Sequence, residues 1–109
     1  MPEDKAGRQD LQAFAEIDKV IHEPTRLMLM AYLSVVVSAD FLFLLRETGL
    51  TRGNLSSHMS KLEEAGYVKV KKEFVDKKPR TLFTFTDEGR AAFRHYREQM
   101  QQVLDSLPD

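Results

Sequence analysis

The sequence predicts a mainly helical α+β fold with one β-hairpin between its helices, and three observations support this prediction. Apolar residues recur at three- and four-residue spacing through most of the chain, as on one face of a helix. Between Gly66 and Phe85 the spacing changes to two, which is typical of half-buried strands. The chain has 109 residues, of which 42% are hydrophobic and 30% charged, so it is the size of one domain with a packed core.

The N-terminal half is expected to be helical. We expect residues 1–10 to form a flexible segment and residues 11–109 to form a single domain. A helix with one apolar face is predicted from Leu11 to Ile21, and Pro24 ends it or begins the next. A buried helix is predicted for residues 25–37, followed by a break at residues 38–40 and a short helix at about residues 41–47. The core positions expected in the buried helix are Leu27, Met30, Leu33 and Val36.

The C-terminal half is expected to contain two further helices and the hairpin. Thr51 is a suitable N-cap for a helix that runs to Ala65, and Gly66 stands where a left-handed C-cap favours glycine. Two strands follow, joined by a polar turn over residues 76–80. Thr86 is expected to cap a long final helix. Its apolar residues form a heptad-like seam, which consists of Phe93, Tyr96, Met100, Val103 and Leu107.

The helix predicted for residues 51–65 has an unusual outer face. Leu55, Met59 and Leu62 form a narrow buried stripe, whereas the opposite side carries Gly53 and short hydrogen-bonding side chains. Small residues allow another surface to approach closely, and these side chains can bind base edges or phosphates. Although the net charge is −1, residues 52–80 contain eight Lys or Arg and four Asp or Glu residues. A helix-turn-helix followed by a basic hairpin therefore predicts a DNA-binding unit, with an ordinary solvated surface as the alternative.

Three stretches resemble winged helix-turn-helix transcription regulators. TRGNLSSHMSKLEEAGYV, residues 51–68, is similar to the recognition helix and following strand of MarR-type and ArsR-type proteins. HEPTR, residues 22–26, resembles the start of the first core helix of that fold. KKPRTLFTFTDEGRAAF, residues 77–93, resembles the wing and the beginning of the last helix. The likeness covers about residues 14–97 and is strongest to the compact MarR-like winged helix DNA-binding domains.

This resemblance implies a winged helix-turn-helix with a two-stranded β-hairpin wing and long terminal helices. It further implies a sequence-specific double-stranded DNA-binding transcriptional regulator, usually a repressor, that binds a palindromic operator as a homodimer. Residues 51–65 would be the recognition helix in the major groove, the wing at 76–80 would meet the backbone or minor groove, and residues 87–107 would be the dimerisation helix. The DNA-binding residues implied are Thr51, Arg52, Asn54, Ser56, Ser57, His58 and Lys61 on the helix and Lys77, Lys78 and Arg80 at the wing.

Several alternatives stay open at this point. A winged-helix module that binds proteins without DNA would carry an apolar patch on the 51–65 face, where this sequence is polar. His58 is expected either to contact a phosphate or to pack at the helix edge. The seam of the last helix packs either on its own domain or on a second copy. The terminal helices are shorter than in many MarR-type proteins, so whether a small-molecule effector binds is left open.

Other classes of function find no support in the sequence. The absence of cysteine excludes disulfides, thiolate zinc sites and cysteine nucleophiles. His22 and His95 lack metal-ligand spacing, and no Ser-His-Asp set or glycine-rich phosphate loop is present, so we expect no metal, no cofactor and no enzyme. No apolar run approaches the roughly 18 residues of a membrane span, and the N-terminus lacks a signal-peptide pattern. We therefore expect a cytoplasmic protein without membrane contact.

Overall fold

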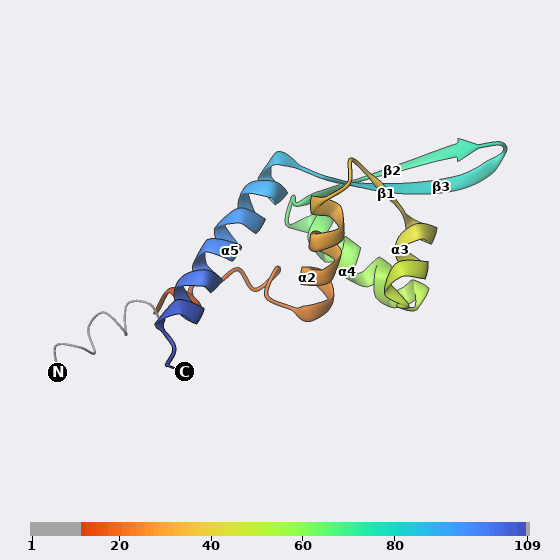
Figure 1. The fold of residues 1–109 in the computed structure, drawn as a ribbon. Helices are drawn as coiled ribbons and strands as arrows, with labels where there is room; N and C mark the ends of the chain where they lie inside the picture. The colour runs from red at the N-terminus through yellow and green to blue at the C-terminus, as the bar shows by residue number, and fades with distance from the viewer. Residues whose placement is uncertain (1–11, 109) are drawn as a thin grey trace.

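The computed structural model describes residues 12–108, so the expected flexible segment at residues 1–10 lies outside the described residues. The elements are α2 (Pro24–Ser34), β1 (Ala39–Asp40), α3 (Phe41–Thr48), α4 (Arg52–Glu64), β2 (Val68–Val75), β3 (Lys78–Phe85) and α5 (Asp87–Ser106). The strands form one antiparallel sheet in the order β1-β3-β2. Figure 1 shows α2, α3 and α4 below the sheet, with the hairpin tip and α5 pointing away in opposite directions. The mainly helical α+β class is thus confirmed.

The prediction of a helix from Leu11 to Ile21 is wrong in its extent. Only residues 12–15 of the described segment are helical, and residues 16–23 form turns. The Asp18 carboxylate explains the change, because its Oδ1 accepts hydrogen bonds from the backbone N–H groups of Val20 (2.8 Å) and Ile21 (3.3 Å). Such a local side-chain acceptor satisfies the backbone without a helix. Ile17 and Ile21 are nevertheless buried in the core, as an apolar face would require.

The segment after α2 forms a strand that the sequence did not reveal. The helix begins at Pro24 as expected but ends at Ser34, and the side chains of Val35 and Val37 are exposed. Ala39 and Asp40 then pair with Phe83 and Leu82 of β3, so the sheet has three strands where a two-stranded hairpin was expected. A strand of two residues is too short to produce a recognisable alternation of apolar and polar positions.

The core lies between the helices and the sheet. Of the positions expected in α2, Met30 and Leu33 are buried, whereas Leu27 and Val36 are partly buried. Burial of apolar surface of this kind is the main stabilising contribution to the fold. The fully buried side chains come from the N-terminal segment and from α2, α3 and α4, and they are Ile21, Leu29, Met30, Leu33, Leu44, Leu55, Met59 and Leu62.

The hairpin turn is tighter than the five-residue turn expected over residues 76–80. Val75 pairs with Lys78, so only Asp76 and Lys77 lie in the loop, with φ angles of 53° and 66°. Two consecutive positive φ angles define the two-residue turn whose twist matches that of the flanking strands. Lys78, Pro79 and Arg80 therefore belong to β3, which begins three residues before the expected strand at Thr81.

The predicted caps are confirmed, and they set the directions of α4 and α5. The hydroxyl of Thr51 accepts a hydrogen bond from Asn54 N (3.1 Å), and Gly66 has a φ of 84° after the end of α4. Thr86 Oγ1 accepts from Gly89 N (2.8 Å) and donates to Gly66 O (2.6 Å), which joins the start of α5 to the end of α4. Across residues 12–108, the helices are all too short or too polar to span a bilayer.

Candidate nucleic-acid interface

The helix-turn-helix consists of α3, a short turn and α4. Gly49 ends α3 with a φ of 71°, a left-handed conformation that glycine adopts at low cost. Leu55, Met59 and Leu62 then hold α4 against the core. This packing leaves the other side of α4 in solvent. Six of the seven predicted helix residues are exposed there, and they are Thr51, Arg52, Asn54, Ser56, Ser57 and Lys61.

His58 differs from the other six, because its ring is turned toward the N-terminal end of α2. Its Nδ1 lies 3.1 Å from Arg26 Nη1 and 3.6 Å from Glu23 Oε2. Arg26 is only 8% exposed, and its Nε donates to Val20 O at 2.6 Å. The structure therefore places His58 in a polar cluster at the helix edge, which is one of the two roles expected for it.

The carboxylate of this cluster is stabilised in its charged form. Burial alone would raise the pKa of Glu23, but four other influences together lower it below its ordinary value. These are hydrogen bonds from the backbone N–H groups of Arg26 and Thr25 and the charges of His58 and Arg26. Glu23 is also the N-cap of α2, since its side chain accepts from Arg26 N at 2.8 Å. The cluster thus fixes one edge of α4 to the start of α2.

Two arginines flank a groove between β3 and the N-terminal ends of α3 and α4. The guanidinium carbon of Arg52 lies 5.8 Å from the centre of the Phe41 ring. Arg80 Nε lies 3.3 Å from the carboxylate of Asp40, which is also the N-cap of α3. Arg80 therefore sits at the base of the hairpin extension, where Asp40 partly neutralises it, and not at the tip. The groove, lined in part by Pro79, has a volume of about 350 Å³.

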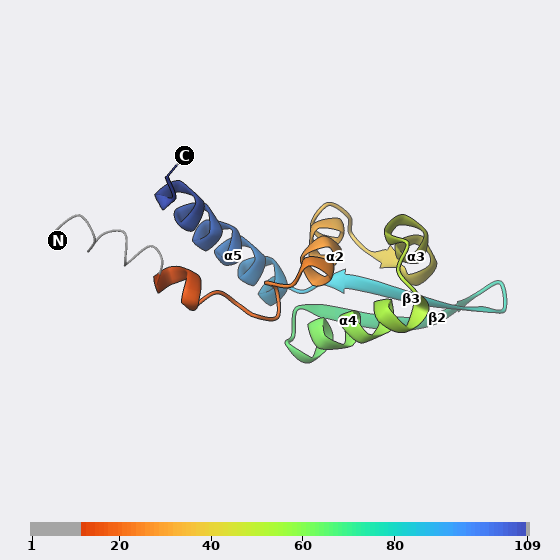
Figure 2. The ribbon, with the colours of Figure 1, turned by 90° about the horizontal axis from the view of Figure 1, so that it is seen from below.

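The hairpin tip carries the remaining predicted residues. Lys77 lies in the two-residue turn and Lys78 begins β3, and both are exposed. The tip extends beyond α3 and α4 in both views (Figures 1 and 2). Exposed cations at such a position can reach a phosphate backbone that passes the free face of α4.

Comparison with known proteins identifies the family. Residues 25–104 match the family described as the winged helix DNA-binding domain. The chain belongs to this family. Within the winged helix, α4 is the second helix of the helix-turn-helix, the position of the expected recognition helix, and the β2–β3 hairpin is the wing; the family and fold are those of transcriptional regulators, not of enzymes.

Individual proteins share the winged helix along most of their length. An uncharacterised protein of Methanocaldococcus jannaschii is 33% identical over 89 residues, which cover 82% of this chain and 97% of that protein. A transcriptional regulator homologue of Pyrococcus horikoshii is 33% identical, with a TM-score of 0.83 over 90% of this chain and 99% of that chain. A MarR-family regulator of Streptomyces coelicolor, solved in complex with DNA, is 22% identical, with a TM-score of 0.58 over 92% of this chain and 72% of that chain. This last likeness concerns the fold alone.

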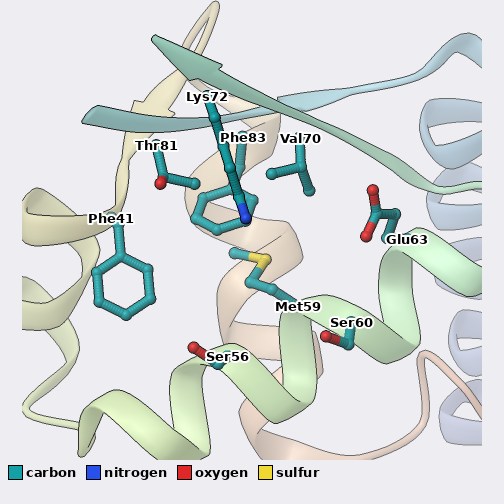
Figure 3. Close-up of a pocket in the computed structure, with 9 residues that line it drawn as sticks. All are labelled: Phe41, Ser56, Met59, Ser60, Glu63, Val70, Lys72, Thr81 and Phe83. Atoms are coloured by element: carbon teal, nitrogen blue, oxygen red, sulfur yellow. The ribbon is translucent and has the colours of Figure 1, made fainter. Parts of the chain in front are cut away.

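A second groove separates the recognition helix from the wing, as Figure 3 shows. Its floor is apolar, with Met59 and Phe83 at the centre, and its volume is about 270 Å³. Lys72 extends from β2 into this groove, and Glu63 of the recognition helix lies at its edge. Lys72 was not among the residues predicted from the sequence, although its position two residues after Val70 on the same strand face indicates this orientation.

Proposed function

We propose that this winged helix protein is a sequence-specific double-stranded DNA-binding transcriptional regulator that represses transcription as a homodimer. Recognition helix 51–65 would enter the major groove, and the wing at residues 76–80 would meet the backbone or minor groove. One observation carries the proposal: the free side of α4 is lined by short polar and basic side chains next to a protruding wing with a lysine-bearing tip.

The geometry supports distinct tasks for the predicted residues. Asn54 and Ser57 are exposed on α4 and suit hydrogen bonds to base edges. Lys77 and Lys78 suit phosphate contacts, which supply affinity but no sequence information. The Asp40 ion pair suggests that Arg80 orients the wing in addition to any phosphate contact. The cluster with Glu23 and Arg26 likewise favours a positioning role for His58.

The proposed dimer rests on the apolar surface at the end of α5. Within the expected seam, Tyr96 and Val103 are buried in the single chain, whereas Leu107 is 50% exposed and neighbouring Leu104 is 57% exposed. Two exposed leucines near the end of one long helix suit a twofold contact with a second copy. Twofold symmetry would place two recognition helices about 34 Å apart and would make the operator a pseudo-palindrome.

The rival function, a protein-interaction module without DNA binding, is less well supported. It would require an apolar surface on the outer side of α4, but the exposed residues between Arg52 and Glu64 are polar, charged or glycine. The cytoplasmic location expected from the sequence remains a prediction that depends on the proposed DNA-binding function.

The test is selection of bound duplexes from a randomised DNA pool at two salt concentrations, followed by sequencing. An enriched inverted repeat is the expected result, and it would supply the operator for reporter assays of repression. Salt-sensitive binding without enrichment would indicate a nonspecific DNA-binding protein. Lack of binding even at low salt would contradict the proposal and favour the protein-interaction module.

A further inference from the structure

The wing exposes an aromatic side chain that none of the predicted DNA contacts uses. Phe74 lies on β2 close to the hairpin turn and is 77% exposed, and Val75 next to it is also exposed. It lies four residues beyond Val70, which packs against the core, and is therefore roughly 13 Å farther along the strand. Holding a phenyl ring in water at the end of a protruding hairpin is unfavourable, and such exposed apolar side chains are typical of binding surfaces.

The strand register shows which side of the wing this ring occupies. Lys72, two residues earlier on β2, lines the groove beside the recognition helix, and alternate residues of a strand share a face. Pro79 is directly opposite Phe74 and lines the other groove together with Arg52 of α4. Directly opposed residues also share a face. Both relationships place Phe74 and Pro79 on the side of the hairpin that faces the N-terminal ends of α3 and α4.

The charges around Phe74 indicate its partner. Lys72 shares its face, and Lys77 and Lys78 follow at the turn. The nearby acids are Glu73, whose carboxylate lies 3.5 Å from Lys71 Nζ, and Asp76 in the turn. An exposed apolar ring with a lysine on its own face and two lysines at the adjacent turn complements a polyanion that offers apolar edges between its phosphates. Duplex DNA has this character, because sugars and base edges lie between the two phosphate backbones of the minor groove.

We propose that Phe74, supported by Pro79, is an apolar wedge that enters the minor groove beside the major-groove site of the recognition helix. This inference rests on the proposed DNA-binding function and adds a contact of different physical character. Lysine contacts release counterions and steepen the salt dependence of binding, whereas an apolar wedge adds affinity that salt does not screen. A wedge between base steps also kinks the duplex, which the lysines alone do not require.

The experiment compares wild-type protein with Phe74→Thr and Phe74→Leu on a selected operator duplex. Phe74→Thr keeps a good strand former but removes the ring, and it should weaken binding by about tenfold with an unchanged log–log salt slope. Phe74→Leu should retain most of the affinity, since leucine also serves as a wedge. Fluorescence energy transfer between the duplex ends should show a kink with wild type and with Phe74→Leu that is reduced with Phe74→Thr.

Val37→Thr is the matched control, because Val37 is another exposed apolar residue and lies outside the wing. It should leave both affinity and DNA shape unchanged. Equal affinity and equal kinking for wild type and Phe74→Thr would overturn the wedge while leaving the DNA-binding function intact. A change in sedimentation of the free protein caused by Phe74→Thr would also overturn it, because the partner of the ring would then be a second copy. Absence of wild-type binding to any duplex would instead refute the DNA-binding function itself.

Discussion

Asp18 shows how one side chain ties the N-terminal segment to the domain. Its Oδ1 holds the turn at Val20 and Ile21, and its Oδ2 accepts a hydrogen bond from the hydroxyl of Tyr67 at the end of the α4–β2 connection. Burial, this hydrogen bond and the negative charges of Asp18 and Glu88 together raise the pKa of Tyr67 to about 12. The folded state therefore retains the phenol proton at a pH at which an unfolded tyrosine, with a pKa near 10, has lost it.

Tyr67→Phe should lower the free energy of unfolding by about 1 kcal/mol at pH 7, because a hydrogen bond to a carboxylate is lost. The difference from wild type should be fully present below pH 10 and should diminish as the pH rises toward 12, since the raised pKa stabilises the fold only while the folded state binds the extra proton. Urea unfolding at pH 7 and pH 11 measures this. Tyr32→Phe is the control, and a deficit for Tyr67→Phe that is the same at both pH values would contradict the assignment.

Two glycines illustrate different constraints at the residue scale. Gly53 lies on the exposed side of α4, and a Cβ there would meet nothing within 4 Å. Gly89 is buried at the start of α5, and a Cβ there would lie 2.2 Å from the carbonyl oxygen of Tyr67. A side chain at position 53 therefore has free space in the isolated protein. Position 89 instead requires glycine, because the start of α5 packs directly on the backbone of Tyr67.

Gly53→Ala should stabilise the fold by roughly 0.5 kcal/mol but weaken operator binding by about tenfold, since the methyl group would occupy space at the proposed DNA interface. Thermal unfolding and DNA titration of the same variant measure the two effects. Gly89→Ala should instead destabilise the fold by roughly 1–3 kcal/mol through its clash with Tyr67. Unchanged DNA affinity of Gly53→Ala would argue against close approach of α4 to the duplex.

At the scale of elements, the position of the wing depends on its two-residue turn and on one ion pair at its base. The turn needs positive φ at both Asp76 and Lys77, and the Arg80–Asp40 ion pair holds the base of the wing against the start of α3. Replacing Arg80 therefore combines loss of charge with loss of orientation. The contribution of charge to DNA binding is better tested at the lysines of the tip. The residue that replaces Lys77 must tolerate the left-handed backbone conformation at that position, and asparagine does.

The double variant Lys77→Asn, Lys78→Gln should weaken binding to all duplexes and reduce the log–log salt slope by about 0.9 for each phosphate contact removed. Sequence preference should be unchanged, because phosphates carry no base information. Fluorescence anisotropy over a range of salt concentrations provides the slope. Lys69→Gln, at an exposed lysine near the opposite end of β2, is the control for loss of a lysine charge outside the tip. A wild-type slope for the tip variant would show that the wing tip does not contact the backbone.

On the scale of the whole molecule, the described residues form an elongated shape (Figures 1 and 2). The recognition helix and wing lie at one end, and α5 runs toward the other (Figure 2). This separation would let the proposed contact between two α5 helices join two copies while both proposed DNA-binding ends stay free. Such an arrangement suits two half-sites on one duplex.

Leu104→Glu combined with Leu107→Glu should weaken self-association by tenfold or more, because it places charges on the apolar end of α5. Sedimentation velocity at several micromolar concentrations measures the change. Binding to the full inverted repeat should weaken more than binding to a single half-site. Val37→Glu, another exposed apolar position, should affect neither property. A monomeric wild-type protein at these concentrations would contradict the proposed dimer.

The local chemistry of the sequence determined much of this molecule. Thr51, Gly66 and Thr86 fixed the ends of helices, since capping and positive φ depend on the residue itself. The period of three and four placed Leu55, Met59 and Leu62 in the core, and the remaining side of α4 was thereby predicted to be exposed. The resemblance of three sequence stretches to known regulators also predicted the winged helix family, and the family match confirms it.

Only the tertiary structure decided what depends on contacts between distant residues. It paired Ala39 and Asp40 with β3, turned His58 toward Glu23 and Arg26, and drew Arg80 away from the wing tip to Asp40. It also confined the expected first helix to residues 12–15 within the described residues and formed turns around Asp18. Periodicity and capping are encoded within a few neighbouring residues, whereas a hydrogen bond or ion pair across 30 to 40 positions exists only once the chain has folded around it.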